Sequence, residues 1–449
     1  MRVGTPFEFG RVGFLVRLRR AGFCSALLSY VFASAVVAQE ATFEPLVEAR
    51  LRNEHVDQEA IAKPADAVTL RVRAGVEANL ERWSALVEGQ GTVALLDHYY
   101  DGLNGAENRP LVADPPDAAL YRAQIGYKDA DLAVTVGRQE IVLDEQRFVT
   151  SAPFRQNGET FDAARLSWIG AQKLSMDITY AWNEQTIWGV RGTGTRPPNI
   201  PGPKVFTEFG YTAPIGTLTA FSYLVGQDEA AIDYRMSSRT AGARLVGERI
   251  ANSDLKFNYE LSYASQAGWR SNPNRYTARF YLLDVSAQLS RVAVGAGYEV
   301  AGASGGAPLT SFQFPVGSGF RYRGWDSKFF PTPPDGVRDL YGSLAYTIPQ
   351  SELPFKIEFQ SIYHYFESDR LVRHYGSELD LLARAQWGRY TASVRFAGYH
   401  ASLFATDTRK LWLQLDWVYG AQGARLENVF EPQAHVKSPA GPLGDAATR

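Results

Sequence analysis

The sequence predicts an all-β protein, a transmembrane antiparallel β-barrel of about 18 strands with short periplasmic turns and long extracellular loops. Three observations lead to this fold class. Apolar and polar residues alternate with a period of two in many short segments. The gaps between these segments are short and long in strict alternation, as expected when turns and loops lie at opposite ends of one sheet. After residue 38, no apolar run approaches the ~20 residues that a membrane-spanning helix requires.

The alternating segments place their large apolar side chains on one face. Successive side chains of a strand point to opposite sides, so one face can meet lipid while the other faces the interior. In chain order, the clearest segments are 47–54, 68–77, 174–182, 255–263, 292–300, 355–363, 379–385, 390–396 and 411–419. Segments 217–225 and 240–247 alternate less clearly, and a shift of one residue would exchange their faces.

The gaps predict which end of the barrel each connection occupies. Short gaps lie at 79–81, 128–131, 170–172, 212–216, 290–291 and 386–388. Long gaps lie at 97–117, 143–160, 183–203, 226–239 and 301–336. With a periplasmic N-terminus, every long gap falls outside the cell. The 301–336 gap is rich in Phe, Tyr and Trp, and we expect this loop to fold onto or into the pore.

The two ends of the chain differ from its middle. Residues 1–38 combine a basic region, an apolar run over 21–37 and a small-residue site at Ala38, which together predict a secretory signal peptide. A membrane-anchor helix is the alternative for this run, but serines interrupt it. The outer-membrane barrel is predicted over 39–420. The tail, 421–449, shows no alternation, and we expect it to be disordered.

Composition excludes several classes of function. The formal net charge is −2, so no global field attracts nucleic acid, and we expect no nucleic-acid partner. Cys24 is the single cysteine and lies in the predicted signal peptide, so the mature chain should have no disulfide and no cysteine nucleophile. The many aromatic residues suit the interfacial girdles of a barrel, although a large soluble all-β protein would also be rich in them.

Several motifs, spread in order over about 44–420, resemble the alginate export family of outer-membrane β-barrel proteins. The most specific are Gly137-Arg138-Gln139-Glu140-Ile141, Asp144-Glu145-Gln146-Arg147-Phe148 and Arg155-Gln156-Asn157-Gly158-Glu159-Thr160-Phe161-Asp162-Ala163. The resemblance implies an eighteen-stranded barrel whose arginine-rich lumen passes a polyuronate. The tail after residue 420 departs from the family pattern, in which an aromatic-ended strand closes the chain.

The family motif suggests one group of candidate site residues around an outward-facing hairpin: Arg138, Arg147, Arg155 and Arg165. Guanidinium groups present planar, bidentate donors to carboxylates, so these residues could hold a passing anionic solute. Acidic residues are interleaved with them in nearly equal number. The alternative is therefore an internal ion-pair network that stiffens the hairpin.

A second group of candidates follows from strand alternation alone. We expect inward-facing arginines on two adjacent strands and on one strand near the barrel closure: Arg50, Arg52, Arg71, Arg73 and Arg395. Such a basic wall would favour anions. The alternative is that each arginine pairs with a neighbouring glutamate. We expect the lumen to be wet, so that removing one of these charges leaves no desolvated partner.

These features predict an outer-membrane channel that passes an anionic solute by passive diffusion, namely a carboxylated oligo- or polysaccharide such as alginate. Expected partners are outer-membrane lipid, the saccharide and a periplasmic assembly partner. No cofactor and no metal site are expected, because the histidines lack metal-ligand spacing. A structural or adhesive barrel with a plugged lumen is one alternative. An outer-membrane hydrolase is another, since His400 lies near Ser402, but no orienting third group is evident.

Overall fold

The computed structural model describes residues 40–419, apart from 144–145, 171–172, 253 and 351–352. The chain divides into Met1–Ala41 and Thr42–Arg449, and every strand belongs to the second part. The predicted signal peptide (1–38) and the predicted disordered tail (421–449) lie outside the described residues, as do Asp144 and Glu145 of the family motif.

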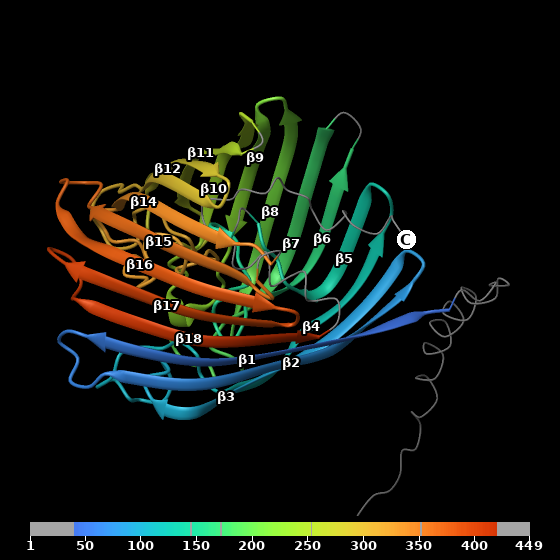
Figure 1. Ribbon diagram of the computed structural model, residues 1–449, viewed down its shortest axis with the longest axis horizontal. Coiled ribbons are helices and arrows are strands. Elements are labelled where there is room, and N and C mark those ends of the chain that lie inside the picture. Colours follow the sequence, from blue (N-terminus) through green and yellow to red (C-terminus); the bar gives the residue numbers. More distant parts are fainter. Residues whose placement is uncertain (1–39, 144–145, 171–172, 253, 351–352, 420–449) are drawn as a thin grey trace, which may run out of the picture. The chain divides into compact units, whose positions relative to one another are not determined.

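The described chain forms one antiparallel sheet whose strands follow in sequence order (Figure 1). The strands are β1 (Thr42–Gln58), β2 (Ala65–Leu80), β3 (Trp83–His98), β4 (Asp117–Lys128), β5 (Leu132–Gln139), β6 (Thr160–Ile169), β7 (Leu174–Gln185), β8 (Asn199–Ala213), β9 (Gly216–Val225), β10 (Ser238–Ile250), β11 (Leu255–Gly268), β12 (Thr277–Leu289), β13 (Val292–Ala301), β14 (Val337–Ile348), β15 (Lys356–Glu367), β16 (His374–Trp387), β17 (Tyr390–Ala401) and β18 (Thr408–Tyr419). A short 3₁₀ turn, η3 (Ala230–Ile232), lies between β9 and β10. Within the described residues, no helix is long and apolar enough to cross a membrane.

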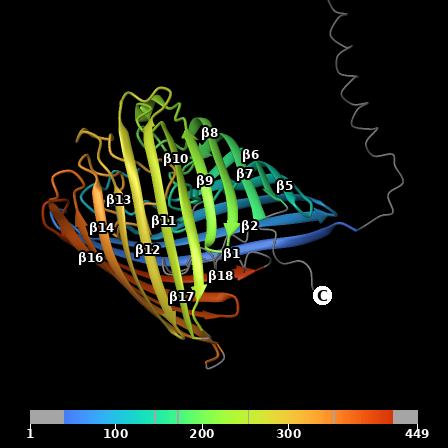
Figure 2. The same cartoon turned by 90° about the horizontal axis from the view of Figure 1, so that it is seen from above.

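The sheet closes on itself because the last strand pairs with the first. Val47 of β1 lies opposite Tyr419 of β18, and the pairing continues to Gln58 opposite Thr408. The closure is visible where β18 runs beside β1 in Figure 1, and the strands of the other side, including β9–β13, appear in Figure 2. Closure leaves every strand paired on both sides, which a β-structure needs in lipid. The prediction of a closed barrel with about 18 strands is confirmed.

The connections sort by barrel end, as predicted, but not strictly by length. One end carries 59–64, 99–116, 140–159, 186–198, 226–237, 269–276, 302–336, 368–373 and 402–407. The other end carries 81–82, 129–131, 170–173, 214–215, 251–254, 290–291, 349–355 and 388–389. The 349–355 connection is longer than the 368–373 connection that follows it in the chain, so the strict alternation of short and long gaps expected from the sequence is wrong at this pair.

Burial follows the alternation along each strand. In β18, Leu413 and Leu415 are exposed on the outer face, whereas Gln414 and Asp416 are buried inside. The ambiguous segment 217–225 is resolved as β9, with Leu218 exposed and Phe221 buried. Inward aromatic residues such as Phe221 obscured the pattern in the sequence, because they break the rule that the inner face of a barrel is polar.

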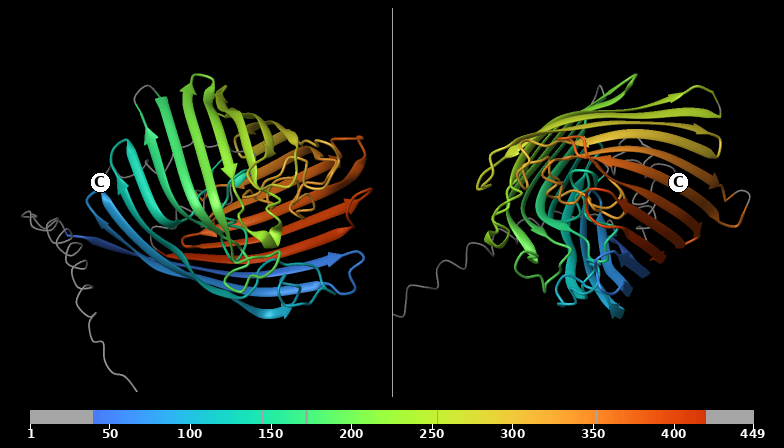
Figure 3. Two further views of the ribbon diagram at one scale, coloured as in Figure 1. Left: turned by 180° about the vertical axis from the view of Figure 1, so that it is seen from behind. Right: turned by 90° about the vertical axis from the view of Figure 1, so that its left-hand side faces the viewer.

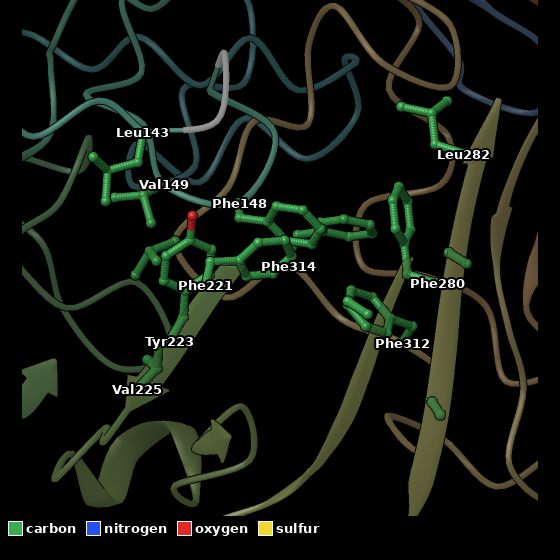
Figure 4. Packing of buried hydrophobic residues seen from close by; sticks show 14 of the residues in the cluster. Leu143, Phe148, Val149, Phe221, Tyr223, Val225, Phe280, Leu282, Phe312 and Phe314 are labelled. Carbon is green, nitrogen blue, oxygen red and sulfur yellow. The ribbon is translucent and has the colours of Figure 1, made fainter. Parts of the chain in front are cut away.

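Two loops fold into the barrel and supply an apolar core. Figure 3 shows these segments within the ring of strands, and Figure 4 shows Phe148 and Phe314 packed between Phe221 of β9 and Phe280 of β12. The ring centroids of Phe148 and Phe314 lie 5.6 Å apart. The expectation that the aromatic 301–336 segment folds into the pore is confirmed.

Candidate functional site

Five arginines form the group that we call the basic wall. They come from β1, β2 and β17 and are only 1–6% exposed: Arg50, Arg52, Arg71, Arg73 and Arg395. Each occupies an inward position because strand alternation turns its neighbours, which are apolar apart from Asn53, to the outer face. Arg50 lies directly opposite Arg71 in the β1–β2 ladder. Like charges placed directly opposite each other destabilise a sheet, so this arrangement requires negative charge or oriented dipoles nearby.

Carboxylates supply part of the negative charge that these arginines require. Arg50 Nε lies 2.7 Å from Asp416 Oδ1, across the β1–β18 seam. Glu48 is shared: its Oε1 lies 2.7 Å from Arg71 Nη2 and 3.2 Å from Arg73 Nη1. The basic wall therefore has one carboxylate between two guanidinium groups on its β2 side.

Oriented dipoles come from the amide oxygens of Gln414 and Gln90 and from main-chain carbonyl groups of the 146–159 segment. Arg50 Nη1 donates to the main-chain oxygen of Pro153 at 2.8 Å, and Arg52 Nη2 donates to that of Phe154 at 2.5 Å. Arg71 Nη1 donates to the main-chain oxygen of Arg155 at 3.2 Å. Three consecutive carbonyl groups thus lie on the basic wall.

An aromatic contact reinforces this attachment. The Arg52 guanidinium lies 4.3 Å from the centroid of the Phe154 ring, and the Arg395 guanidinium lies 5.9 Å from it. Phe154 also meets Trp412 of β18 edge to face at 5.8 Å. The quadrupole of an aromatic ring attracts a guanidinium group that lies over its face, and the attraction is stronger when both groups are desolvated.

The expectation of a wet lumen is wrong at the basic wall. Glu48 and its two arginines are almost fully buried, and the 146–159 segment covers the guanidinium groups of β1. Removing an arginine here leaves a buried carboxylate behind, which is costly. The sequence could not reveal this, because the covering loop lies about a hundred residues away along the chain.

The family-motif arginines do not form one site. Arg138 on β5 pairs with Asp162 on β6 at 2.8 Å, and Arg165 on β6 pairs with Asp177 on β7 at 2.8 Å. Arg147 reaches across the interior to an ion pair with Glu299 of β13. The Arg155 guanidinium lies 6.0 Å from the Phe154 ring centroid. The loop of this β5–β6 hairpin turns into the barrel, so Arg147 contacts the interior, whereas Arg138 and Arg165 form ion pairs between neighbouring strands.

Sequence reasoning missed a group of buried carboxylates, Glu378 and Asp380, on β16, the strand that pairs with β17. Carboxylates of β16 accept main-chain N–H groups of the 302–336 loop: Trp325 donates to Asp380 at 3.1 Å, and Asp326 donates to Glu378 at 2.7 Å. Glu299 holds both loops, since Arg323 of the 302–336 loop lies 2.5 Å from it. The clustering of acidic residues at Glu378 and Asp380 was the available signal.

Burial shifts the pKa values of two charged residues of the 302–336 loop, Lys328 and Asp326. Burial lowers the pKa of Lys328 to about 8, and repulsion by Lys410 adds to the shift. Burial also raises the pKa of Asp326, although Lys410 and Lys328 oppose the effect. Lys328 Nζ donates to Thr408 Oγ1 at 2.5 Å, which ties the loop to the start of β18.

The hydrolase candidate finds little support in the geometry. His400 is largely exposed, and its Nδ1 lies 3.2 Å from Asp407 Oδ2. The main-chain N–H of Ser402 donates to the main-chain oxygen of Tyr375 at 3.0 Å, and Ser402 lies in the 402–407 connection between β17 and β18. Among the described residues, no group of three or more His, Cys, Asp or Glu side chains could hold a metal ion.

Comparisons with known proteins agree with this architecture. The family described as alginate export matches residues 47–322 of the chain. Among curated proteins, no sequence matches. The fold resembles the crystal structure of Acinetobacter baumannii OccAB4, with a TM-score of 0.63 and 10% identity over 85% of this chain and 99% of that one.

Two Pseudomonas aeruginosa structures give a similar result. OccK3 (OpdO) has a TM-score of 0.59 and 14% identity, covering 84% of this chain and 96% of its own. OpdK, solved with vanillate, has a TM-score of 0.60 and 10% identity, covering 84% and 98%. At these identities, the likeness shows the fold.

Proposed function

The chain belongs to the alginate export family and is a channel-type β-barrel of the Gram-negative outer membrane, and from this premise we propose that it passes a carboxylated oligo- or polysaccharide such as alginate. Passage is by passive diffusion through the interior along the basic wall. The partners are the surrounding outer-membrane lipid, the anionic saccharide and a periplasmic assembly that supplies or receives it.

The observation that carries this proposal is that two hydrogen-bond donors of the basic wall lack an acceptor within the described part of the chain. Glu48 is divided between Arg71 and Arg73. The Nε of Arg71 and the Nη2 of Arg73 are buried and lack a hydrogen-bond partner within the described part of the chain. Buried donors without an acceptor are costly, so such groups favour a ligand that brings acceptor oxygens. A carboxylate brings two oxygens and a negative charge in the geometry of the guanidinium fork.

A relative of the same fold gives independent support. OpdK was solved with vanillate, which is an aromatic carboxylate. The present chain offers arginines beside the Phe154 ring, the combination that suits a carboxylate on a planar or ring-shaped body. Uronate units combine a carboxylate with a sugar ring, whose C–H face can pack on an aromatic side chain.

A second candidate function is a structural or adhesive surface barrel with a plugged lumen. It is favoured by the aromatic core that the two loops build inside the barrel, including Phe148, Phe314 and Phe329. A plug of this kind would block flow altogether, whereas a channel needs at least one conducting state.

Reconstitution in a planar bilayer separates the two candidates. We expect single-channel steps and a reversal potential in a KCl gradient that indicates anion preference. An oligomer of galacturonate should block this current, and a neutral oligosaccharide of equal length should not. A barrel that stays closed at all voltages would support the structural alternative, and cation preference without block would contradict the proposed substrate class.

A further inference from the structure

The loop contacts of the basic wall resemble a bound ligand. Arg50, Arg52 and Arg71 donate to the main-chain oxygens of residues 153–155, which are consecutive in the chain. These oxygens are the negative ends of neutral dipoles. Hydrogen bonds from a guanidinium to a carboxylate are stronger than those to a neutral acceptor, roughly by a factor of two. An incoming carboxylate therefore competes favourably for the same donors.

We infer that the 153–155 carbonyl groups occupy the carboxylate subsite of the basic wall, and that a carboxylated saccharide displaces them and thereby moves the 146–159 segment. The inference rests on the proposed function. It adds that the 153–155 carbonyl groups compete with the solute for the arginines, so that binding of the solute moves the segment that covers them. The buried Nε of Arg71 and Nη2 of Arg73, which lack an acceptor in the described chain, are further donors that the carbonyl groups leave unused.

The other contacts of the segment are the buried ion pair of Arg147 with Glu299, hydrogen bonds and ring contacts. Gln156 donates from its main chain to Asp114 at 2.8 Å and from its amide to Thr69 Oγ1 at 2.7 Å. The Phe154 ring stacks on Phe320 of the 302–336 loop. A ligand shifts a conformational equilibrium only by its differential affinity for the two states. A carboxylate meets this condition, because the donors that now bind the 153–155 oxygens become available to it only when those carbonyl groups have left.

Accessibility of a buried loop residue reports the displacement. Ser151 lies in the segment, is 2% exposed, and is not itself a ligand of the basic wall. Ser237 is a matched control, since it is fully buried in the 226–237 loop, where Gln227 donates to its hydroxyl at 2.9 Å. The full chain would carry either Ser151→Cys or Ser237→Cys, with Cys24, the only native cysteine, replaced by Ser.

The experiment measures the rate of labelling by a membrane-impermeant thiol reagent, with tri-galacturonate or with maltotriose as the neutral probe. We expect tri-galacturonate to accelerate labelling at Ser151→Cys by about tenfold, the difference between charged and neutral acceptors, while maltotriose has no effect. Labelling at Ser237→Cys should not respond to either sugar.

The outcomes separate this inference from the proposed function. If tri-galacturonate blocks the bilayer current but leaves labelling of Ser151→Cys unchanged, the displacement is refuted and the channel proposal stands. If it neither blocks nor accelerates labelling, both are refuted. Equal acceleration at Ser151→Cys and Ser237→Cys would indicate general loosening of the barrel and would also overturn the displacement.

Discussion

Phe154 and Phe320 stack with their ring centroids 3.4 Å apart and their planes only 6° from parallel. The two residues belong to different inward loops, the 146–159 segment and the 302–336 loop. The first loop is attached to the basic wall, and the second is attached to the acidic carboxylates of β16. The ring pair is therefore one of the contacts that join the two loops, together with the Phe148–Phe314 pair and the hydrogen bond from the main-chain N–H of Thr150 to Val316.

Coupling between these rings should be measurable by a double-mutant cycle. We expect Phe154→Leu and Phe320→Leu to destabilise the barrel less together than the sum of the single changes. The interaction should be about 0.5–1.5 kcal/mol, the range for aromatic pairs. The temperature at which the folded barrel loses its fast gel mobility gives the stabilities. Strict additivity would mean that these two rings are energetically independent.

The shared carboxylate predicts a rescue. Replacing both Arg71 and Arg73 by Ser removes the two arginines that form ion pairs with Glu48, which is 6% exposed. A buried charge that loses its partners costs roughly 3–5 kcal/mol. Adding Glu48→Gln should recover a large part of this loss in the same gel assay. Arg82→Ser, which breaks the exposed pair with Asp129, should change stability little.

The rescued triple variant also tests selectivity. Its basic wall is less positive than that of the parent, while the buried glutamate is no longer charged. We expect the anion-to-cation permeability ratio to fall by about fivefold, the factor that roughly 1 kcal/mol represents. The difference should shrink at 1 M salt, where the Debye length is only about 3 Å. An unchanged ratio would assign the arginines of β2 a purely structural role.

The outer face of the barrel could be predicted from the sequence, and the contents of its interior could not. Alternation in β18 places Leu413 and Leu415 outside because lipid accepts only one kind of side chain. The interior imposes no such rule. Phe221 of β9 faces inward because Phe148 of a distant loop packs on it at 5.4 Å, a contact that no local pattern encodes.

The same limit applies to the candidate site. The inward positions of Arg50 and Arg71 follow from their apolar strand neighbours. Their partners do not, since the carbonyl groups of 153–155 belong to a loop about a hundred residues away from Arg50 along the chain. Every residue type has a main-chain carbonyl group, so a sequence motif cannot show which of these groups bind arginines. Only the folded loop reveals it.

Lys328 predicts a pH dependence of stability. Burial lowers its pKa to about 8, whereas an unfolded lysine titrates near 10.4. Between these values, the unfolded chain binds more protons than the folded one, so stability should rise with pH from about 8 to about 10. The rise is at most about 1.4 kcal/mol per pH unit. Below pH 8, both states are protonated and the contribution is constant.

A comparison of variants separates the contribution of Lys328 to the pH dependence of stability from that of other titrating groups. In Lys328→Met, the gain in thermal stability between pH 8 and pH 10 should be smaller than in the parent. Lys63→Met changes an exposed lysine and serves as the control, with a profile parallel to that of the parent. Parallel profiles for all three proteins would show that Lys328 is not desolvated.

The sorting of connections by barrel end predicts the orientation in the cell. Cysteines at Glu107 and Gly305, both exposed in long connections, should react with an impermeant reagent on intact cells. Cysteines at Ala130 and Arg291, exposed in short turns, should react only after the outer membrane is permeabilised. The reverse pattern would invert the barrel in the membrane.

Uptake into proteoliposomes tests most directly whether the barrel passes carboxylated saccharides. Vesicles containing the parent protein should take up tri-galacturonate faster than maltotriose, and the triple variant Glu48→Gln, Arg71→Ser, Arg73→Ser should lose this preference while remaining folded. Equal uptake of the two sugars by the parent, or uptake no faster than in protein-free vesicles, would contradict a carboxylate-selective channel.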